Sequence, residues 1–433
     1  MRENKNYPPC LTIDKLKKIK NNVLNLPPSK AVSIRGLYLP LLGIKKVILE
    51  NIPDSDDFNV NLDAVQKLGV EVKKHEGRIH LINNNEYPLI PKSGILDIGN
   101  SGLGIRFLIT LFSFLQTKTK IKTGKQLAQR PLLQDCEHLL SMGAKFKVRK
   151  NFLYINSTQL KVKTRIKIKT SITSQYLSAL LFFGWKYGIE QIKLTTHPLS
   201  FSYIKTTLKL LKCANIVWKF KNNTFYLKKK IIKKEVSITI PPDASIASNF
   251  LVLACILAEK IVIKNFKCSS DEPDFCVLKI LKKIGATYRF FKNDLFFTGK
   301  IKKTHLKIDL RNNPDLLPPL AIMSLFLYKG GILKNIGHTR FKESERNKVI
   351  VKELSKLQIK VEEFNNNLVI PGAFYNHTSY LNSQNVPSAI LDCHNDPRIF
   401  MAFAILGCVI GNITIKNPHS LLKTFPDFLK YLY

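Results

Sequence analysis

The chain has 433 residues, 45% of them hydrophobic, which is enough for two or three domains with buried cores. It carries 68 basic and 31 acidic residues, a formal net charge of +37. Only 12 of the basic residues are Arg, and the many Lys are spread along the whole chain. Nucleic-acid-binding proteins usually concentrate their charge and interleave it with aromatic residues, so coding bias over the surface explains this charge better.

The eight Cys form no CxxC pair and no Cys/His spacing typical of a zinc site. We therefore expect a reduced, cytoplasmic protein without a metal. The N-terminus lacks the apolar segment of a signal peptide, and the longest apolar stretches, 107–115 and 399–410, are too short to span a bilayer. We expect a monomer with neither a membrane nor a nucleic acid as partner.

A unit made of a helix, a short turn and a strand pair recurs along the chain. Each copy has an amphipathic stretch, then the turn, then two strand-like stretches joined by a polar tip, which predicts a surface helix followed by a β-hairpin. Glycine, found at three of the turns, is typical of a helix C-cap. The five turns lie 71 to 74 residues apart and are centred on Gly69, Gly143, Ala214, Gly285 and Gln358.

A second predicted helix recurs with the same period and is apolar on nearly all sides, which is typical of a helix inside a core. Each copy opens with residues that cap helices well. The six openings are Ser29-Lys30, Asn100-Ser101-Gly102, Thr173-Ser174-Gln175, Asp243-Ala244-Ser245, Asn313-Pro314-Asp315 and Asn395-Asp396. The chain therefore contains six repeated units, and we expect the segment 11–26 to supply the strands that the sixth unit lacks.

Two Pro-Pro pairs, Pro27-Pro28 and Pro241-Pro242, divide the six units into two sets of three. We interpret them as crossovers between a discontinuous domain, residues 1–27 plus 242–433, and an inserted domain, residues 28–241. Ordinary helix-start prolines are an alternative compatible with this interpretation. The predicted fold is α/β: a two-domain inside-out α/β barrel with three units per domain, whose buried helices point their N-termini at the interdomain cleft.

The stretch 338–357 combines Lys342, Glu343 and Arg346 with apolar residues at helical spacing. Ser344 is the expected N-cap of this helix. The free N–H groups and the dipole of a helix start favour anions, and an arginine fork adds bidentate binding. The stretch is therefore a candidate site for a phosphate or a carboxylate, and a solvated charged face is the alternative.

Nine short motifs carry a resemblance that runs in order over essentially the whole chain. They are PSKAVSIR at 28–35, GNSGLGIR at 99–106, TGKQLAQRP at 123–131, SITSQY at 171–176, DAS at 243–245, PD at 314–315, RFKESER at 340–346, NDPR at 395–398 and KTFPD at 423–427. Together they resemble the 5-enolpyruvylshikimate-3-phosphate synthase family. Any one motif is weak evidence, but nine in register on a sixfold repeat are specific.

The resemblance implies that the protein transfers the enolpyruvyl group of phosphoenolpyruvate to the 5-hydroxyl of shikimate 3-phosphate, releasing phosphate, without a metal or another cofactor. The residues implied to bind phosphoenolpyruvate are Lys30, Gly102, Arg130, Gln175, Arg346, Arg398 and Lys423. Those implied to bind shikimate 3-phosphate are Lys30, Arg35, Thr173, Ser174, Gln175, Ser200, Tyr203, Asp315, His338 and Lys342. Three have implied catalytic roles: Asp315 accepts the hydroxyl proton, Glu343 protonates the methylene carbon, and Lys30 assists.

Several of these residues also have plain structural interpretations. Asp315, Thr173 and Ser174 could each be a helix cap. Tyr203 could be a surface packing residue. Arg106 has no implied contact with substrate, and we expect it to support its loop.

Four positions depart from the pattern of the family. Ala31 stands where a Ser is usual, Leu103 where a Thr is usual, His338 replaces an Asn, and Pro397 replaces a His. Each lost hydrogen bond could weaken binding by about 1–3 kcal/mol if its partner stays buried. The resemblance therefore implies an active enzyme that is slow or binds weakly.

Two other functions stay open from the sequence. The first is enolpyruvyl transfer to UDP-N-acetylglucosamine, but the Cys in the loop of that sister family has no counterpart after Thr123-Gly124. The second is a decayed, non-catalytic relative that binds RNA through its basic surface, which would show a steep salt dependence.

Overall fold

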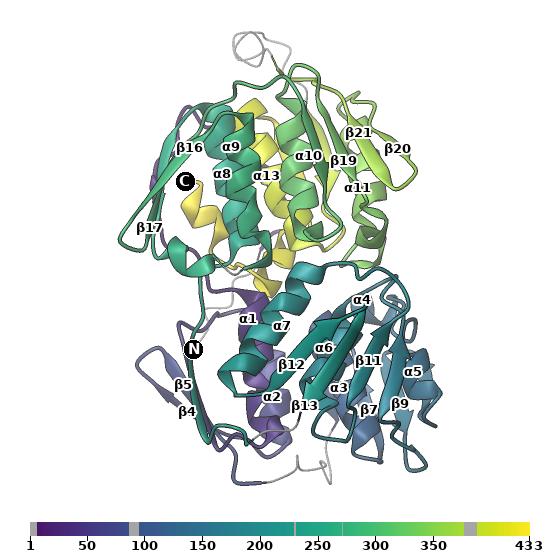
Figure 1. The fold of residues 1–433 in the computed structure, drawn as a ribbon. Coiled ribbons are helices and arrows are strands. Elements are labelled where there is room, and N and C mark those ends of the chain that lie inside the picture. The colour runs from purple at the N-terminus through teal and green to yellow at the C-terminus, as the bar shows by residue number, and fades with distance from the viewer. Residues whose placement is uncertain (1–6, 86–94, 229–230, 271, 376–387) are drawn as a thin grey trace. The chain divides into compact units, whose positions relative to one another are not determined.

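The structure is a computed structural model that describes residues 7–85, 95–228, 231–270, 272–375 and 388–433. It divides into two compact units, each with its own hydrophobic core (Figure 1). The discontinuous unit is Met1–Pro27 with Pro241–Tyr433, and the inserted unit is Pro28–Ile240. The predicted domain boundary after residue 241 differs from this division by one residue, whereas the predicted interdomain cleft stays a prediction.

Three four-stranded sheets of one topology belong to the inserted unit. In each sheet the first two strands are parallel and the other neighbours are antiparallel. Their strand orders are β14 (Glu235–Thr239), β3 (Lys46–Glu50), β5 (Arg78–Ile82), β4 (Glu71–His75); β6 (Leu96–Asp97), β7 (Lys118–Lys122), β9 (Phe152–Asn156), β8 (Lys145–Arg149); and β10 (Arg165–Ile168), β11 (Gln191–Leu194), β13 (Thr224–Lys228), β12 (Val217–Lys221).

The described residues of the discontinuous unit form two sheets of this topology and one of three strands. Their orders are β2 (Val23–Leu24), β15 (Lys260–Ile263), β17 (Asp294–Thr298), β16 (Thr287–Phe291); β18 (Leu306–Asp309), β19 (Gly331–Lys334), β21 (Asn367–Ile370), β20 (Glu362–Phe364); and β1 (Cys10–Ile13), β23 (Ile413–Lys416), β22 (Ala389–Asp392). Each sheet again contains one parallel pair. The hairpins follow the predicted turns in every sheet that has four strands.

The N-terminal segment does not behave entirely as predicted. Strand β1 joins the last sheet, as expected, through antiparallel pairing with β23. Strand β2, however, pairs in parallel with β15 and therefore completes the fourth sheet of the chain rather than the sixth. In the inserted unit, similarly, the last strand, β14, pairs in parallel with the first strand, β3.

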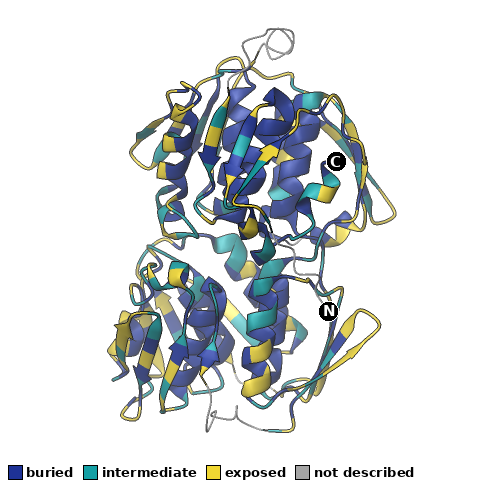
Figure 2. Ribbon diagram, turned by 180° about the vertical axis from the view of Figure 1, so that it is seen from behind, coloured by how far each residue is buried: buried dark blue, intermediate teal, exposed yellow. Residues whose placement is uncertain are grey.

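Six buried helices begin at or next to the predicted openings. They are α1 (Lys30–Leu37), α3 (Gly102–Phe114), α6 (Gln175–Phe183), α8 (Ala244–Leu257), α10 (Leu317–Leu325) and α13 (Pro397–Ile410). All 13 residues of α3 and all 14 of α13 are buried. Figure 2 shows these interior helices as buried along their length, with exposed residues concentrated on strands and turns. The all-round apolar pattern thus predicted interior helices correctly.

Within each unit the buried helices pack together. Helices α8, α10 and α13 contact one another in the discontinuous unit (Figure 1). In the inserted unit α3 packs on α6, and the ring of Tyr38, at the end of α1, lies 5.1 Å from Phe107 of α3 and 6.5 Å from Phe183 of α6. The polar first residues of the helices are therefore held by a rigid apolar interior.

The remaining helices include the predicted surface helices and short connecting turns. The α-helices are α2 (Asp56–Lys67), α4 (Lys125–Ala128), α5 (Glu137–Leu140), α7 (Phe201–Cys213), α9 (Val277–Ile284) and α11 (Arg346–Ser355). The 3₁₀ helices are η1 (Leu39–Leu42), η2 (Phe266–Ser269), η3 (Pro273–Cys276), η4 (Pro314–Leu316), η5 (Gly337–Phe341), η6 (Pro418–Lys423) and η7 (Phe428–Tyr431).

Left-handed residues follow the surface helices at the predicted turns. Gly69, Gly143, Gly285 and Gln358 have φ values of 92°, 104°, 136° and 60°. The third turn is centred one residue later than predicted, because Asn215, with φ 65°, takes the left-handed position instead of Ala214. Asn tolerates this conformation better than Ala, which explains the shift.

A buried Asn joins α1, α2 and α3. The Asn61 Oδ1 atom accepts from the Tyr38 hydroxyl at 2.9 Å, and Asn61 Nδ2 donates to Ser101 Oγ, the N-cap of α3, at 2.8 Å. A Cβ added to Gly104 would lie 2.1 Å from Asn61 Oδ1. Asn61 and Gly104 are thus a matched pair, in which the missing side chain of one makes room for the other.

We predict that Gly104→Ala destabilises the protein although alanine favours helices by about 1 kcal/mol. The new methyl group must displace Asn61, and the loss of its buried hydrogen bonds costs about 1–3 kcal/mol. Urea unfolding of Gly104→Ala, Asn61→Ala and the double variant measures this. The double variant should lose less than the two single losses together. A more stable Gly104→Ala protein would contradict the matched pair.

Candidate functional site

Arg346 is the centre of a buried ion-pair network in the discontinuous unit. It is the first residue of α11, and its side chain is 1% exposed. Its guanidinium donates from Nη1 to Asp315 Oδ1 at 2.7 Å, from Nη2 to Glu343 Oε2 at 3.0 Å and from Nε to Asp396 Oδ2 at 2.8 Å. Burial lowers the pKa of Arg346, but the three carboxylates outweigh burial and raise it well above its usual value. The guanidinium is therefore a permanent cation.

Three more cations surround the same carboxylates. The distances are 3.7 Å from Lys342 Nζ to Asp315 Oδ1, 3.8 Å from Arg398 Nε to Asp315 Oδ2, 3.5 Å from Arg398 Nη2 to Asp243 Oδ2 and 3.8 Å from Lys423 Nζ to Glu343 Oε1. We call these residues the Arg346 cluster: the cations Lys342, Arg346, Arg398 and Lys423 and the carboxylates Asp243, Asp315, Glu343 and Asp396. Each carboxylate of the cluster thus lies beside at least one of its cations.

The carboxylate of Asp315 faces cations rather than a helix start. Asp315 lies in η4, ahead of α10, and its oxygens face Arg346, Lys342 and Arg398. Burial raises the pKa of Asp315, but these three cations outweigh burial and hold the pKa well below its usual range. Asp315 is therefore ionised, which is the state that a proton acceptor requires. The helix-cap interpretation of Asp315 is not what the structure shows.

The predicted cap of α11 is wrong by one residue. Glu345, and not Ser344, is the N-cap position, and it makes no side-chain capping bond. The hydroxyl of Ser344 instead donates to Asp396 Oδ2 at 3.1 Å. A buried carboxylate is a strong hydrogen-bond acceptor. The Ser344 hydroxyl therefore binds Asp396 of the Arg346 cluster and does not cap α11.

His338, in η5, is a buried imidazole in the neighbourhood of the same charges. It is 5% exposed, and neither ring nitrogen has a hydrogen-bond partner among the described residues. Burial, and then the charge of Lys342, lower its pKa from 6.5 to about 3. A neutral imidazole can both donate and accept a hydrogen bond. Because buried polar atoms rarely stay unpartnered, His338 is suited to meet a polar ligand.

In the inserted unit, two of the predicted cations lie on α1. Lys30 is its first residue, and Lys30 Nζ lies 3.1 Å from Asp57 Oδ2. Arg35 is 2% exposed; its Nε donates to Thr207 Oγ1 at 2.7 Å and its Nη1 to the Ala31 carbonyl at 2.7 Å. Both side chains are thus held in fixed orientations before any ligand binds.

Gly102 lies where three predicted site elements of the inserted unit meet. Arg106 Nη1 donates to the Gly102 carbonyl at 3.0 Å and to Gln175 Oε1 at 2.9 Å, so Arg106 supports this loop. A Cβ on Gly102 would lie 2.6 Å from Arg130 Nη1. Arg130 therefore lies close to the first residue of α3, and Gln175 Oε1 would lie 3.7 Å from the same Cβ.

The loop before α6 carries the predicted hydroxyls. Thr173 Oγ1 accepts from the Gln175 N–H at 3.2 Å and therefore caps the helix, whereas Ser174, at the N-cap position, makes no side-chain capping bond. Ser200 has a left-handed backbone, φ 53°, directly before α7. Tyr203 is partly buried, and its carbonyl accepts from Arg35 Nη2 at 3.4 Å.

Sequence reasoning missed the carboxylates that hold these cations. Asp243 and Asp396 were recognised as helix openings and as parts of two family motifs, without a binding role, and both do accept from a helix N–H, at Ile246 and Arg398 respectively. Each also pairs with an arginine of the Arg346 cluster. No sequence pattern pointed to Asp57 as a partner of Lys30, because the two residues are 27 positions apart.

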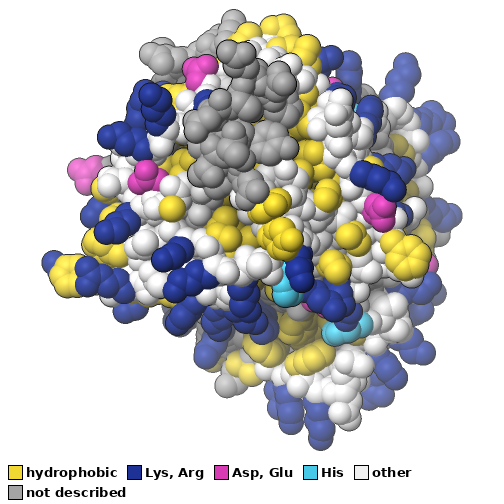
Figure 3. Space-filling view, turned by 90° about the horizontal axis from the view of Figure 1, so that it is seen from above, with side chains coloured by type: hydrophobic (Ala, Val, Ile, Leu, Met, Phe, Trp, Pro, Cys, Tyr) yellow, Lys and Arg dark blue, Asp and Glu magenta, His cyan; other side chains and the backbone are white. Residues whose placement is uncertain are grey.

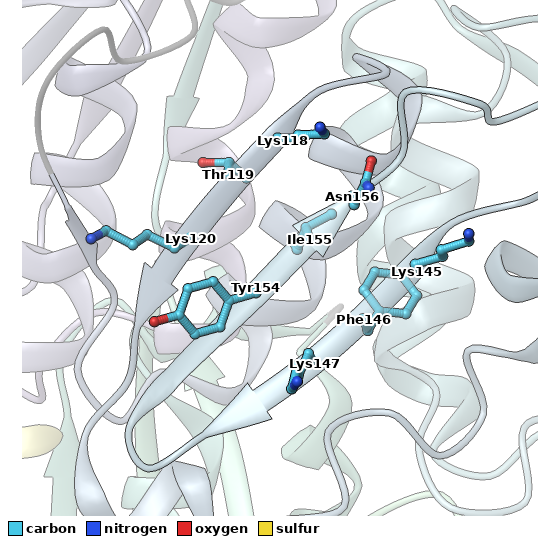
Figure 4. A pocket seen from close by; sticks show the side chains of 9 residues that line it. All are labelled: Lys118, Thr119, Lys120, Lys145, Phe146, Lys147, Tyr154, Ile155 and Asn156. Atoms are coloured by element: carbon cyan, nitrogen blue, oxygen red, sulfur yellow. The ribbon is translucent and has the colours of Figure 1, made fainter.

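A groove in the inserted unit is not part of this site. It has a volume of about 620 Å³ and lies on strands β7, β8 and β9 (Figure 4). Its cations are Lys118, Lys120, Lys145 and Lys147, and no predicted site residue lines it. On the face drawn in Figure 3, Lys and Arg are likewise scattered rather than gathered into one patch. These are the solvent-facing residues of sheets.

Three general features of the described residues bear on function. No helix there is both long and apolar enough to cross a membrane. No group of three or more His, Cys, Asp or Glu side chains in that part of the chain is arranged to hold a metal ion. All eight Cys are free thiols.

Comparison with known proteins gives a consistent result. The family model described as EPSP synthase (3-phosphoshikimate 1-carboxyvinyltransferase) matches residues 13–432. A protein of Blochmanniella pennsylvanica named 3-phosphoshikimate 1-carboxyvinyltransferase is 31% identical over 435 residues, covering 96% of this chain and 96% of its own. One of Buchnera aphidicola with the same name is 30% identical over 421 residues, covering 95% of this chain and 94% of its own.

The fold has solved counterparts as well. The structure of EPSP synthase from Acinetobacter baumannii superposes with a TM-score of 0.73 at 21% identity, covering 98% of this chain and 97% of that one. The two-unit α/β architecture is therefore that of a known enzyme fold. With the profile match over nearly every residue, the sequence and the fold lead to one conclusion: this chain belongs to the EPSP synthase (3-phosphoshikimate 1-carboxyvinyltransferase) family.

Proposed function

We propose that this protein transfers the enolpyruvyl group of phosphoenolpyruvate to the 5-hydroxyl of shikimate 3-phosphate and releases phosphate, a step toward chorismate and the aromatic amino acids. The observation that carries the proposal is the Arg346 cluster, in a chain whose family is named for this reaction. Both substrates are anions. A buried set of cations held by carboxylates is a site that an anion can enter by replacing some of those carboxylates.

The cations are proposed to hold phosphoenolpyruvate, which carries a phosphate and a carboxylate. Arginine presents a planar fork that matches either group, and five of the seven proposed residues are Lys or Arg. The proposed residues are Lys30, Gly102, Arg130, Gln175, Arg346, Arg398 and Lys423. Support comes from the burial of Arg346, Arg398 and Lys423, because buried cations without a function are rare.

Shikimate 3-phosphate is proposed to be held by hydroxyls, one arginine and ring-facing polar groups. The residues are Lys30, Arg35, Thr173, Ser174, Gln175, Ser200, Tyr203, Asp315, His338 and Lys342. The unpartnered nitrogens of His338 support this set, since a sugar-like ring with hydroxyls would supply the missing hydrogen-bond partners.

Two carboxylates are proposed to move protons. Glu343 pairs with Arg346 as a carboxylate, and we propose that it takes up a proton when phosphoenolpyruvate binds. It gives that proton to the methylene carbon of phosphoenolpyruvate, and positive charge develops on the carbon that bears the phosphate. The 5-hydroxyl oxygen bonds to that carbon while Asp315 takes its proton, which gives a tetrahedral intermediate. The departing phosphate takes up the proton held by Asp315, and a proton from the methyl group returns to Glu343, which forms the product. Fixed charges in a dry site stabilise such intermediates strongly.

The other functions have less support. Enolpyruvyl transfer to UDP-N-acetylglucosamine is not favoured, because the relatives and the family model carry the shikimate name. On the face drawn in Figure 3, Lys and Arg are scattered, which does not favour RNA binding. We further propose a cytoplasmic monomer that needs no cofactor, and eight free thiols agree with a reducing compartment.

The decisive experiment is phosphate release by the purified protein with phosphoenolpyruvate, with and without shikimate 3-phosphate, and in parallel with UDP-N-acetylglucosamine. Release that depends on shikimate 3-phosphate, with the enolpyruvyl product identified by mass, supports the proposal. Release only with the nucleotide sugar, or with neither acceptor, overturns it.

We predict that Asp315→Asn lowers turnover by about 10²–10⁴-fold, the usual effect of losing a general base. Asn keeps the shape of Asp but cannot take the proton. The affinity for shikimate 3-phosphate should change far less, because Arg35 and Thr173 lie in the other unit. Turnover and affinity are measured side by side, and near-normal turnover would exclude the catalytic role.

We predict that Gly102→Ala weakens phosphoenolpyruvate binding by moving Arg130, because the added Cβ would lie 2.6 Å from Arg130 Nη1. The longer competitor glyphosate should be affected more than the substrate. The measurement is the KM for phosphoenolpyruvate and inhibition by glyphosate. Gly188→Ala is the control, because an alanine there meets no neighbouring atom and is strained only by its φ of 95°, which should lower stability without changing the KM. Unchanged values for Gly102→Ala would remove Gly102 from the site.

We predict that His338 makes the protein less stable in acid. Its pKa is about 3 when folded and near 6.5 when unfolded, so the unfolded chain binds the extra proton between these values. The free energy of unfolding should therefore fall as pH drops from about 6.5 toward 3. His338→Asn should show a shallower fall in urea unfolding between pH 7 and 4. A fall as steep as in the wild type would contradict the neutral, buried state of His338.

A further inference from the structure

The loop of residues 171–175 is held from behind by one buried carboxylate. Asp135 is 7% exposed and lies between Arg130 and α5. Asp135 Oδ2 accepts from the N–H of Ile172 at 2.9 Å and from that of Thr173 at 3.1 Å, and Asp135 Oδ1 accepts from Ser171 Oγ at 3.2 Å. Three consecutive residues of the loop thus donate to a single side chain.

These bonds are stronger than the usual ones that order a loop. Hydrogen bonds to an ionised carboxylate are about twice as strong as bonds between neutral groups. Asp135 also has a left-handed backbone, φ 65°, which is uncommon outside glycine. Such conformations persist where the surrounding structure over-determines them and are often found at functional sites. The orientation of the Asp135 carboxylate toward the loop is therefore specifically maintained.

A second bond ties the same two segments together. The Tyr176 hydroxyl, fully buried, donates to the Leu132 carbonyl. The segment 130–136 is thus fastened to the loop at both Leu132 and Asp135. Its first residue is Arg130, so the arginine proposed for phosphoenolpyruvate and the hydroxyls proposed for shikimate 3-phosphate belong to one connected piece of structure.

The contacts of Asp135 also indicate whether it binds the loop or the phosphate of the ligand. Its carboxylate occupies the N–H groups of Ile172 and Thr173, so these amides are engaged and a phosphate would have to use the side chains of Thr173 and Ser174. A carboxylate in direct contact with a phosphate would repel it. The small cavity of about 100 Å³ that Asp135 lines is also lined by Lys167, Lys169 and Glu137, and Lys169 Nζ lies 3.2 Å from Glu137 Oε2. Asp135 therefore serves the loop and does not touch the ligand.

We propose that Asp135 is a positioning residue that pre-orders the 171–175 loop for the phosphate of shikimate 3-phosphate. The inference rests on the proposed function, because it takes the ligand of this loop from it. A pre-ordered loop lowers the entropy that binding must overcome. Asp135 should accordingly affect the affinity for shikimate 3-phosphate, and not the chemical step.

The test compares Asp135→Ala and Asp135→Asn with the wild type. Asp135→Ala should raise the KM for shikimate 3-phosphate about tenfold or more, the effect of roughly one net charged hydrogen bond, while kcat and the KM for phosphoenolpyruvate change little. Asp135→Asn keeps an acceptor for the loop amides, so it should restore part of the affinity. Hydrogen exchange of residues 171–175 should be faster in Asp135→Ala and intermediate in Asp135→Asn.

Asp294→Ala is the matched control. Asp294, in the discontinuous unit, also holds a turn by accepting from a backbone N–H, that of Asn265 at 2.9 Å, and from Lys264 Nζ at 2.7 Å. Its loss should lower stability without changing either KM. If Asp135→Ala folds but lowers kcat, or raises both KM values equally, a general structural role replaces the positioning role.

The outcomes separate the two proposals. An active wild type with an unchanged KM for shikimate 3-phosphate in Asp135→Ala overturns the positioning role alone. A wild type inactive with shikimate 3-phosphate overturns the proposed function, and the positioning role for this ligand falls with it. Should Asp135→Ala fail to fold, Asp135→Asn decides by the same KM comparison, and unchanged exchange of residues 171–175 in it counts against the proposal.

Discussion

A guanidinium buried among three carboxylates is the constraint on which the discontinuous unit depends. Taking Arg346 out of water is unfavourable unless its charge is balanced and its donors are used, and Asp315, Glu343 and Asp396 meet both conditions. Removing one partner from such a set typically costs about 3–5 kcal/mol, because a buried charge stays behind. The starts of α11 and α13 and the turn η4 are thereby held together by charge, at the place where the residues proposed to bind substrate in this unit lie.

The apolar interior gives these charges their fixed geometry. Helices α3 and α13 are buried along their whole length, so their first residues cannot move without disturbing a core. A capping residue can also form an ion pair. Asp396 caps α13 by accepting from the Arg398 N–H, and it pairs with the Arg346 side chain. In the inserted unit Asp135 plays the corresponding part for a loop. In both units carboxylates order the groups that are proposed to bind anions.

The elements were predictable from the sequence because their periodicity is local. All-round apolar runs predicted the buried helices, and strand-like stretches joined by a polar tip predicted the hairpins. The cationic residues Arg346 and Arg398 stood out because arginine is scarce in this chain. Pairings between distant residues were not predictable: strand β2 pairs with β15, and Asp135 serves a loop 36 to 38 residues later. Ser344 has the residue type of a cap, yet tertiary contact with Asp396 overrides it.

We propose that the Arg346 cluster is a site for an anionic substrate. Equilibrium binding of phosphoenolpyruvate in the presence of shikimate 3-phosphate, compared between the wild type and Arg346→Lys, tests it most directly. Lysine keeps the charge but loses the fork that contacts three carboxylates and would contact the ligand. We predict at least about a tenfold loss of affinity for phosphoenolpyruvate in an Arg346→Lys variant that still unfolds as one cooperative unit. A tenfold change corresponds to about 1.4 kcal/mol, and bidentate charged contacts contribute more than this. Wild-type affinity in folded Arg346→Lys would contradict the claim.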